Sequence, residues 1–266
     1  MIGQKELLGR IDKEVVEGKL PHFIIIRGGR GIGKWSTANY IACQLGANVI
    51  VVENSVEAVR NLISTVEKST IKTVYVFQRA EELSAQAVNA MLKTLEEPSQ
   101  YAYFVFTTRN DQMLLDTIKS RGTMYTMGAY SPSELTEYNK GQPVPEYCKT
   151  PYDVVLFNRN SGLEEFVQLV VDNIATAPMV NAMKIAESVD VDGTDATKFD
   201  LGLFFEAFKY VCFQRMEESH KMEITQMLYD WMTVTSRYQR DTLRNGANLK
   251  MLFDMWLLDI RELGVV

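Results

Sequence analysis

The amino-acid sequence predicts an α/β protein, with a parallel sheet covered by helices in its N-terminal half and only helices in its C-terminal half. Three observations predict this fold class. Short apolar runs alternate with segments of helical periodicity over the first half, and a glycine-rich loop follows the first of these runs. From about residue 162 onward, apolar residues recur only at helical spacing, so we expect helices alone there.

The predicted strands of the first half are short apolar runs. The run at 23–26 has no polar alternation, which is typical of a strand buried on both faces of a parallel sheet. Further strands are expected at 49–52, 74–77 and 103–107. Helices are expected where apolar residues fall at helical spacing, at 4–17, 34–45, 56–67, 84–96 and 112–118. This alternation predicts a parallel sheet with helices on both faces.

The second half opens with a signal for the start of a helix. Ser131 and Glu134 form a capping-box pattern, with Pro132 at the first helical position. A stretch with one glycine and three prolines, 141–151, then predicts irregular structure. Three apolar stripes follow, at 201–212, 224–238 and 249–260. Because an amphipathic helix cannot bury its stripe alone, we expect these helices to pack as a bundle.

Composition excludes several classes of protein. With 46% hydrophobic and 23% charged residues, the chain is neither disordered nor fibrous. It has no apolar run long enough to span a membrane and no signal-peptide core at its start, so we expect a cytoplasmic protein without a membrane partner. The three cysteines, Cys43, Cys148 and Cys212, have no zinc-motif spacing, so we expect neither zinc nor another metal site.

The net charge of −6 is unevenly distributed. Residues 1–128 carry 15 Lys and Arg against 13 Asp and Glu, a net of +2, and residues 129–266 carry 13 against 21, a net of −8. An acidic half is poorly suited to binding nucleic acid, because the phosphate backbone attracts cations. The charge therefore does not indicate a protein that binds nucleic acid by itself.

The glycine-rich loop has the pattern of a phosphate-binding loop. Gly28, Gly31, Gly33 and Lys34 fit GxxxxGK between an apolar run and a predicted helix, which is the context that such a loop requires. Glycines let the backbone wrap closely, so that its N–H groups point at phosphate oxygens. The helix adds the positive end of its dipole, and Lys34 is placed to reach the terminal phosphates. The candidate ligand is ATP or ADP.

The residue after Lys34 departs from this pattern. A Ser or Thr hydroxyl is needed there to bind Mg²⁺, whereas Trp35 offers an N–H donor and no oxygen ligand. Ser36 follows one residue later, which turns its side chain by about 100° around the helix. We therefore count Ser36 with the loop as a vestigial nucleotide site, and we expect no complete Mg²⁺ site and no required cofactor.

The end of the third predicted strand lacks the acidic residues of an ATPase. An Asp there holds Mg²⁺, and a Glu often orients the attacking water. Here the strand runs into Gln78 and Arg79, while Glu81 and Glu82 lie further on and resemble charges at a helix start. Because both metal-holding elements are missing independently, we expect the chain alone not to hydrolyse ATP.

Several segments resemble the clamp-loader AAA+ proteins of DNA replication. Residues 89–98, NAMLKTLEEP, nearly match the signature NALLKTLEEP of that family. Thr107 and Thr108 lie where the family has its sensor 1 residue. Residues 120–122, Ser-Arg-Gly, resemble its SRC motif, with glycine in place of cysteine. The resemblance covers residues 1–128 well and is weak beyond them.

The resemblance implies an AAA+ core at 1–128, a small helical lid at 129–176 and a collar-like helical domain at 177–266. Motor subunits of the family keep GKT or GKS and an acidic strand end. The delta-prime subunit of DNA polymerase III commonly keeps the fold, the signature and the SRC arginine while losing ATPase residues, and this sequence resembles that type. It lacks the family's cysteine zinc module, as a divergent, phage-type member would.

The resemblance also implies a role for Arg121 as an arginine finger. Phosphoryl transfer spreads negative charge over the γ-phosphate oxygens, and a guanidinium supplied from outside stabilises it. The leading hypothesis is a non-catalytic clamp-loader subunit that donates Arg121 to the ATP of a neighbouring motor subunit. The implied partners are AAA+ motor subunits, a sliding clamp and, through the hetero-oligomer, primed DNA.

Two alternatives stay open. The first is an atypical ATPase motor subunit that uses Lys34 and Glu81 with unusual metal ligation. The second is a degenerate AAA+ protein that binds a clamp loader and inhibits it. This second alternative and the leading hypothesis predict the same sequence features, so the sequence does not distinguish them.

Overall fold

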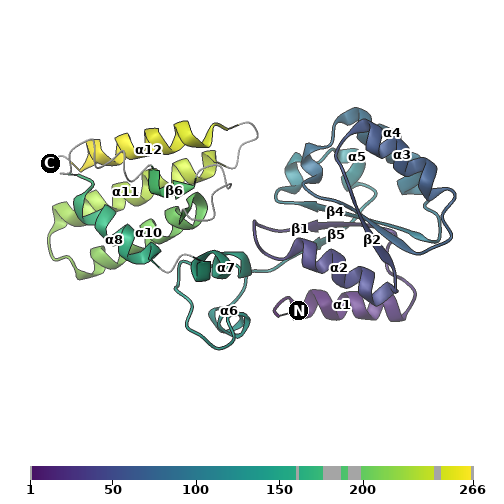
Figure 1. Cartoon of the computed structure of the whole chain (residues 1–266), viewed down its shortest axis with the longest axis horizontal. Helices are drawn as coiled ribbons and strands as arrows, with labels where there is room; N and C mark the ends of the chain where they lie inside the picture. Colours follow the sequence, from purple (N-terminus) through teal and green to yellow (C-terminus); the bar gives the residue numbers. More distant parts are fainter. Residues whose placement is uncertain (1, 160–161, 176–186, 191–198, 243–246, 265–266) are drawn as a thin grey trace. The chain divides into compact units, whose positions relative to one another are not determined.

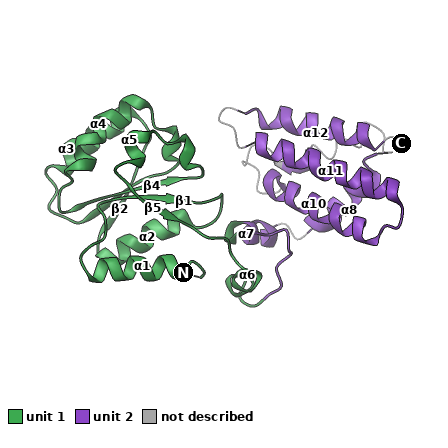
Figure 2. Cartoon of the chain, turned by 180° about the vertical axis from the view of Figure 1, so that it is seen from behind, with its two compact units in different colours: residues 1–141, 150–152 green, residues 142–149, 153–266 purple. Residues whose placement is uncertain are grey.

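The structure is a computed structural model that describes residues 2–159, 162–175, 187–190, 199–242 and 247–264. The chain forms two compact units (Figure 2). The first comprises residues 1–141 and 150–152, and the second comprises 142–149 and 153–266. The boundary between them thus lies inside the lid segment, 129–176, that the sequence predicts. In the described part of the chain, no helix has the length and apolar character needed to cross a membrane.

The first unit is built on a parallel sheet with the strand order β2-β3-β4-β1-β5 (Figure 1). Its strands are β1 (Phe23–Arg27), β2 (Asn48–Val52), β3 (Thr73–Phe77), β4 (Ala102–Thr108) and β5 (Thr123–Thr126). The inner strands β1, β3 and β4 are almost wholly buried, as their apolar sequences predict. Strand β2 is equally apolar but lies at the edge, where Ile50 and Val51 are 44% and 52% exposed.

Helices cover both faces of the sheet, as the sequence predicts. One face carries α1 (Lys5–Val16) and α2 (Lys34–Leu45), and the other carries α3 (Val56–Val66), α4 (Ala85–Glu96) and α5 (Asp116–Lys119) (Figure 1). Successive strand residues point to opposite faces, so Ile24 packs in the core under α1 and α2 while Ile25 packs in the core under α3 and α4. Helix α6 (Pro132–Tyr138) begins at the predicted capping box.

The prediction of one helix over 112–118 is wrong. A 3-10 turn, η2 (Asp111–Met113), is separated from α5 by Leu114 and Leu115, which are both extended. Leu114 is buried in the core under α3 and α4, and its burial outweighs the local helical pattern. The chain therefore enters α5 only at Asp116, five residues before Arg121.

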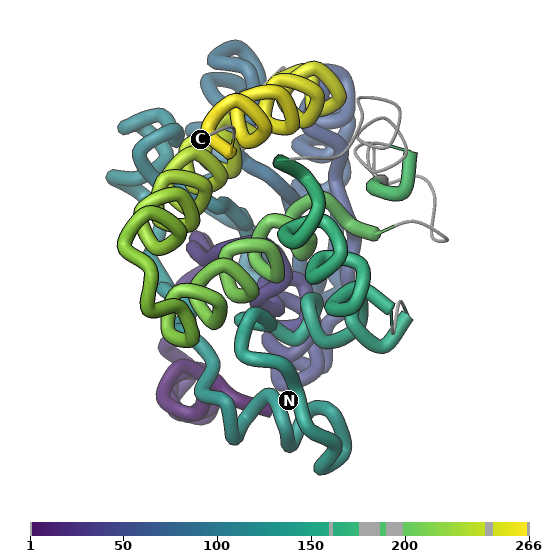
Figure 3. Tube along the Cα trace, turned by 90° about the vertical axis from the view of Figure 1, so that its left-hand side faces the viewer, coloured from purple at the N-terminus to yellow at the C-terminus, as the bar shows by residue number. Residues whose placement is uncertain are grey.

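The second unit is a helical bundle, as predicted. Its helices are α8 (Leu163–Asn173), α10 (Leu201–Glu218), α11 (Met222–Asp241), α12 (Leu249–Leu263) and α7 (Pro151–Arg159), of which the first two residues belong to the first unit. Helix α11 packs against both α10 and α12 (Figure 3). Trp256 of α12 stacks edge-on against Phe204 and Phe208 of α10, and its Nε1 donates to Thr235 Oγ1 of α11 at 2.9 Å. Aromatic packing and one buried hydrogen bond thus join the three helices.

Two details of the second half differ from the sequence analysis. Helices are not the only elements after residue 162, because β6 (Val189–Asp190) pairs in parallel with β7 (Phe199–Asp200). A two-residue strand is too short to leave a periodic signal. The irregular stretch also ends earlier than expected, since Pro151 is the first residue of α7, a position where proline costs no helical hydrogen bond.

Candidate functional site

The phosphate-loop pattern lies in the structural context that the sequence predicts. The loop leaves the carboxyl end of β1 and enters α2 at Lys34. Gly31 and Gly33 have φ angles of +73° and +99°, a region that side chains other than glycine rarely adopt. Thr37 N donates to Gly33 O at 2.9 Å, which closes the first turn of α2. The loop therefore has the backbone of a phosphate-binding loop.

Lys34 is bonded to the loop itself. Its Nζ donates to the carbonyl oxygens of Gly28 and Gly29, each at 2.6 Å. Burial and, to a lesser extent, the positive charge of Arg109 lower the pKa of Lys34 to about 8, against the opposing effect of the negative charge of Glu81. The structure thus brings Lys34, Arg109 and Glu81 into one electrostatic group at the carboxyl edge of the sheet.

The hydroxyl groups of α2 are not arranged for a metal ion. Trp35 is 40% exposed, and Ser36 is exposed as well. Thr37 is buried, and its Oγ1 donates to Gly33 O at 3.1 Å. The one buried hydroxyl of this helix turn therefore bonds to the backbone, and it is not among the residues that the sequence predicts for the site.

A segment distant in sequence packs onto the loop. A Cβ placed on Gly31 would lie 2.5 Å from Tyr152 Cβ and 2.6 Å from Thr150 Oγ1. The guanidinium of Arg30 lies 5.0 Å from the centre of the Tyr152 ring, within the range of a cation–π contact. Residues 150–152, which belong to the first unit, therefore cover part of the loop. No sequence motif marks this contact.

The end of β3 carries basic and amide side chains, as the sequence shows. Gln78 and Arg79 are exposed, and Arg79 has a φ angle of +51° and an ion pair with Glu82 at 2.9 Å. Glu81 Oε1 accepts from Arg109 N at 3.4 Å. Glu81 Oε2 is buried with no hydrogen-bond partner among the described residues. Glu81, which lies beyond the end of the strand, is thus a carboxylate that interacts with both Lys34 and Arg109.

The predicted sensor residues lie at the end of β4. Thr107 and Thr108 are both buried. Thr107 Oγ1 lies 3.5 Å from Phe77 O, as a donor from β4 to β3, and Thr108 Oγ1 donates to Asn110 O at 3.1 Å. Both hydroxyls therefore have partners within the fold. Their place beside the β3 end fits a sensor position, and their bonds equally fit a purely structural role.

Arg121 is held by three acceptors of its own unit. Its Nε donates to Glu96 Oε1 at 2.7 Å, and its Nη2 donates to the same oxygen. Its Nη1 donates to Thr117 O at 2.9 Å and to Ser120 Oγ at 3.3 Å. The side chain stays 30% exposed. The guanidinium is therefore oriented before any partner binds.

The structure explains the glycine in the Ser-Arg-Gly motif. A Cβ on Gly122 would lie 2.4 Å from Ile25 Cδ1 and 3.1 Å from Phe23 Cε1. The isoleucine of β1 fills the space that a cysteine side chain at this position would need. The departure from the family motif is thus a packing adjustment beside Arg121.

Arg121 and the loop lie at opposite ends of the parallel sheet. Arg121 comes two residues before β5, whereas the loop follows β1. Thr123 pairs with Ile24 and Thr126 pairs with Arg27, so the two strands run alongside each other in the same direction. Three steps along a strand span about 10 Å, and the loop lies beyond the far end. The structure does not bring Arg121 together with Lys34.

The comparisons with known proteins point to one family. The family model described as "DNA polymerase III, delta subunit" matches residues 47–130, a stretch that includes Glu96 and Arg121. The DNA polymerase III gamma subunit of Buchnera aphidicola (subspecies Schizaphis graminum) is 25% identical over 219 residues, 70% of this chain and 56% of that protein. The tau subunit of Escherichia coli is 26% identical over 166 residues, 51% of this chain and 26% of that protein.

A solved structure shows the same fold. A DNA polymerase III gamma subunit-related protein from Thermotoga maritima superimposes with a TM-score of 0.56 at 14% identity, covering 97% of this chain and 99% of that one. The chain spans about half the length, or less, of the curated relatives that it matches first. The predicted fold, a parallel AAA+ sheet with a C-terminal helical bundle, is confirmed. The family model, the relatives and this fold together support the identification of the chain as a clamp-loader AAA+ protein.

Proposed function

We propose that this chain is a non-catalytic, delta-prime-like subunit of a DNA-replication clamp loader. It donates Arg121 to ATP bound by a neighbouring motor subunit, and the motor uses that ATP to load a sliding clamp onto primed DNA. The observation that supports this role most directly is the place of Arg121. It lies at the amino end of β5, away from the loop of its own chain, and its guanidinium is oriented and partly exposed.

The loop supports the non-catalytic half of the proposal. Mg²⁺-dependent hydrolysis needs a hydroxyl after the loop lysine and a carboxylate at the end of β3. Trp35 and Gln78 occupy those positions, and both are exposed. Lys34 donates to loop carbonyls, so the loop keeps its shape through its own bonds. ATP or ADP remains a candidate ligand of this vestigial site, without a catalytic role.

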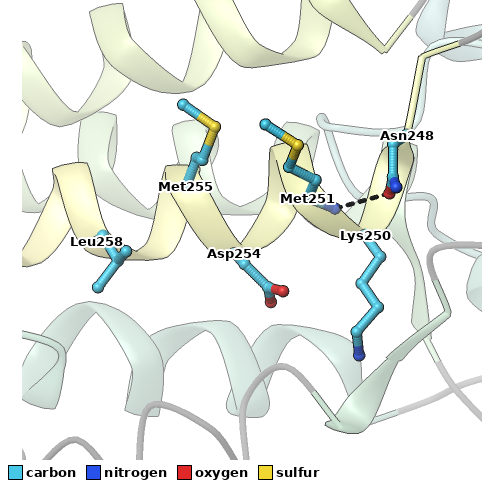
Figure 4. Close-up of a pocket in the computed structure, with 6 residues that line it drawn as sticks. All are labelled: Asn248, Lys250, Met251, Asp254, Met255 and Leu258. Carbon is cyan, nitrogen blue, oxygen red and sulfur yellow. Dashed lines mark hydrogen bonds between the residues drawn. The ribbon is translucent and has the colours of Figure 1, made fainter.

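The second unit supports assembly with other subunits. Helix α12 is capped at its N-terminus by Asn248, whose Oδ1 accepts from Met251 N at 3.0 Å (Figure 4). Met251, Met255 and Leu258 are exposed and line a surface pocket of this helix. Spacings of four and seven residues place them on one side of the helix. In the proposal, this bundle contributes to a collar formed with the helical domains of the other subunits.

The test is reconstitution with the native partners. The tagged chain is captured from its own cells, and the AAA+ partner with an intact GKT or GKS loop and the sliding clamp are identified and purified. ATP turnover of the complex, stimulated by clamp and primed DNA, is then compared for the wild type, Arg121→Ala and the neighbouring control Lys119→Ala. The proposal expects turnover to fall at the ATP site that receives Arg121, because a finger contributes about 10³–10⁵ in rate in well-studied cases.

Two outcomes would contradict the proposal. If Arg121→Ala and Lys119→Ala support equal turnover, Arg121 is not the donor. If adding the wild-type chain lowers clamp loading, and Arg121→Ala lowers it equally, the chain is an inhibitor of the loader.

A further inference from the structure

Glu96 has an unusual place for a carboxylate. It is the last residue of α4, where the partial negative charge of the helix end disfavours acidic side chains, and Glu97 follows directly. The Glu96 carboxylate accepts from Nε and Nη2 of Arg121. The positive charge of Arg121 thus offsets the unfavourable interaction of the Glu96 carboxylate with the C-terminal end of α4. The helices α4 and α5 lie side by side on the same face of the sheet.

We propose that Glu96 is a positioning residue that fixes the guanidinium of Arg121 for its action in trans. The inference rests on the proposed arginine-donor function and deepens it. The acceptors of Arg121 come from separate parts of the unit: Glu96 ends α4, while Thr117 and Ser120 belong to the α5 turn. Together they fix the plane of the guanidinium as well as its place.

The remaining N–H group of Arg121 is the one that a phosphate oxygen can use. A guanidinium has five N–H donors. Bonds to Glu96 account for Nε–H and one hydrogen of Nη2, and bonds to Thr117 and Ser120 account for the two on Nη1. Within the described part of the chain, the second hydrogen of Nη2 has no recorded acceptor. Glu96 therefore holds one edge of the guanidinium while this N–H stays available to a partner.

Both ends of this arrangement are anchored in the core. Met91 and Leu95, which belong to α4 like Glu96, are buried in the core between the sheet and the helices α3 and α4. Gly122, next to Arg121, sits against Ile25 with no room for a side chain. A positioning group on rigid elements keeps its partner in place better than one on a loop. An arginine without such a partner must lose rotamer freedom when it meets the phosphate.

The test uses the reconstituted complex with Glu96→Ala, Glu96→Gln and the adjacent control Glu97→Ala. We expect Glu96→Ala to lower kcat for ATP about three- to thirtyfold with little change in KM, because the guanidinium loses its fixed orientation while substrate binding is unchanged. Glu96→Gln, whose amide oxygen accepts the same bonds, should restore most of kcat. Glu97→Ala should behave as wild type. A melting curve of each chain records any loss of folding.

The double variant separates positioning from other effects. In a background of Arg121→Ala, the change Glu96→Ala should cause no further loss, since residues that act as one unit are not additive. The inference is overturned if Glu96→Ala leaves kcat unchanged or raises it, the latter meaning that Glu96 restrains Arg121. It is also overturned if kcat falls equally in the Arg121→Ala background. If Arg121→Ala alone has no effect, the proposed function fails first, and with it this inference.

Discussion

Lys34 Nζ lies 2.6 Å from the carbonyl oxygen of Gly28, so the lysine of the phosphate loop is bonded to the loop in which it stands. The side chain of Lys34 is half-buried, and its amino group lies in the field of Arg109. Both observations lead to predictions about the stability of the first unit, as a function of pH and after substitutions in the loop.

Lys34 predicts a rise in stability at alkaline pH. Burial lowers its pKa in the folded chain to about 8, below the ordinary value of 10.5. Between these values the unfolded chain binds more protons than the folded chain, so the free energy of unfolding increases with pH. Below pH 8 both states are protonated, and this contribution no longer varies. Urea unfolding from pH 7.5 to 10.5 should show the rise in the wild type and a smaller one in Lys34→Met. Parallel curves for the two chains would show that the pKa of Lys34 is not lowered by folding.

Replacing two glycines of the same loop by alanine is predicted to have very different effects on stability. Gly31→Ala forces a side chain into the +73° region of φ and into Tyr152 and Thr150. We expect it to lower the free energy of unfolding by about 1–3 kcal/mol. Gly29→Ala is the matched control, because a Cβ at Gly29 meets no atom within 4 Å. Urea denaturation of both variants measures the difference, and equal stabilities would contradict the contact of residues 150–152 with the loop.

The packing around Gly122 predicts that a cysteine, the residue of the SRC motif at this position, does not fit here. Gly122→Cys places its Cβ 2.4 Å from Ile25 Cδ1, and overpacking of this kind costs about 1–3 kcal/mol of stability. Ile25→Ala removes that methyl group and also Cγ1, which would lie 2.6 Å from the new Cβ. We therefore expect adding Gly122→Cys to an Ile25→Ala background to cost less stability than adding Gly122→Cys to the wild type. Thermal unfolding of the four chains gives the coupling, and simple additivity would count against this contact.

The sequence identifies local features of the site better than the contacts made across it. The GxxxxGK spacing predicts the loop, its strand and its helix, because all three lie within 23 consecutive residues, 23–45. Tyr152 covers Gly31 from more than 100 residues away, and no pattern within either segment indicates the pairing. The signature that contains Glu96 identifies the family and leaves open the partner of that carboxylate.

The features of the fold that the sequence does not predict are missed for the same reason. The apolar run of β2 reads like that of β1, yet β2 lies at the sheet edge, since strand order is decided by the whole chain. The helical pattern over 112–118 is interrupted at Leu114, which is buried in the core under α3 and α4. In both cases tertiary packing determines the local structure, and the sequence of a single segment does not indicate that packing.

The isolated chain is predicted to lack Mg²⁺-dependent ATP turnover. Two of the three N–H donors of Lys34 are bonded to Gly28 O and Gly29 O, Trp35 provides no metal ligand, and Gln78 stands where a metal-holding carboxylate is needed. Phosphate release by the purified chain, with and without Mg²⁺, should equal that of Lys34→Ala. Turnover that needs Mg²⁺ and disappears in Lys34→Ala would instead support the atypical ATPase. Glu81, whose buried Oε2 has no hydrogen-bond partner in the described ranges, would then be the first carboxylate to replace, as Glu81→Gln. Loss of that turnover in Glu81→Gln, with Glu82→Gln as the control, would assign it the role that the end of β3 lacks.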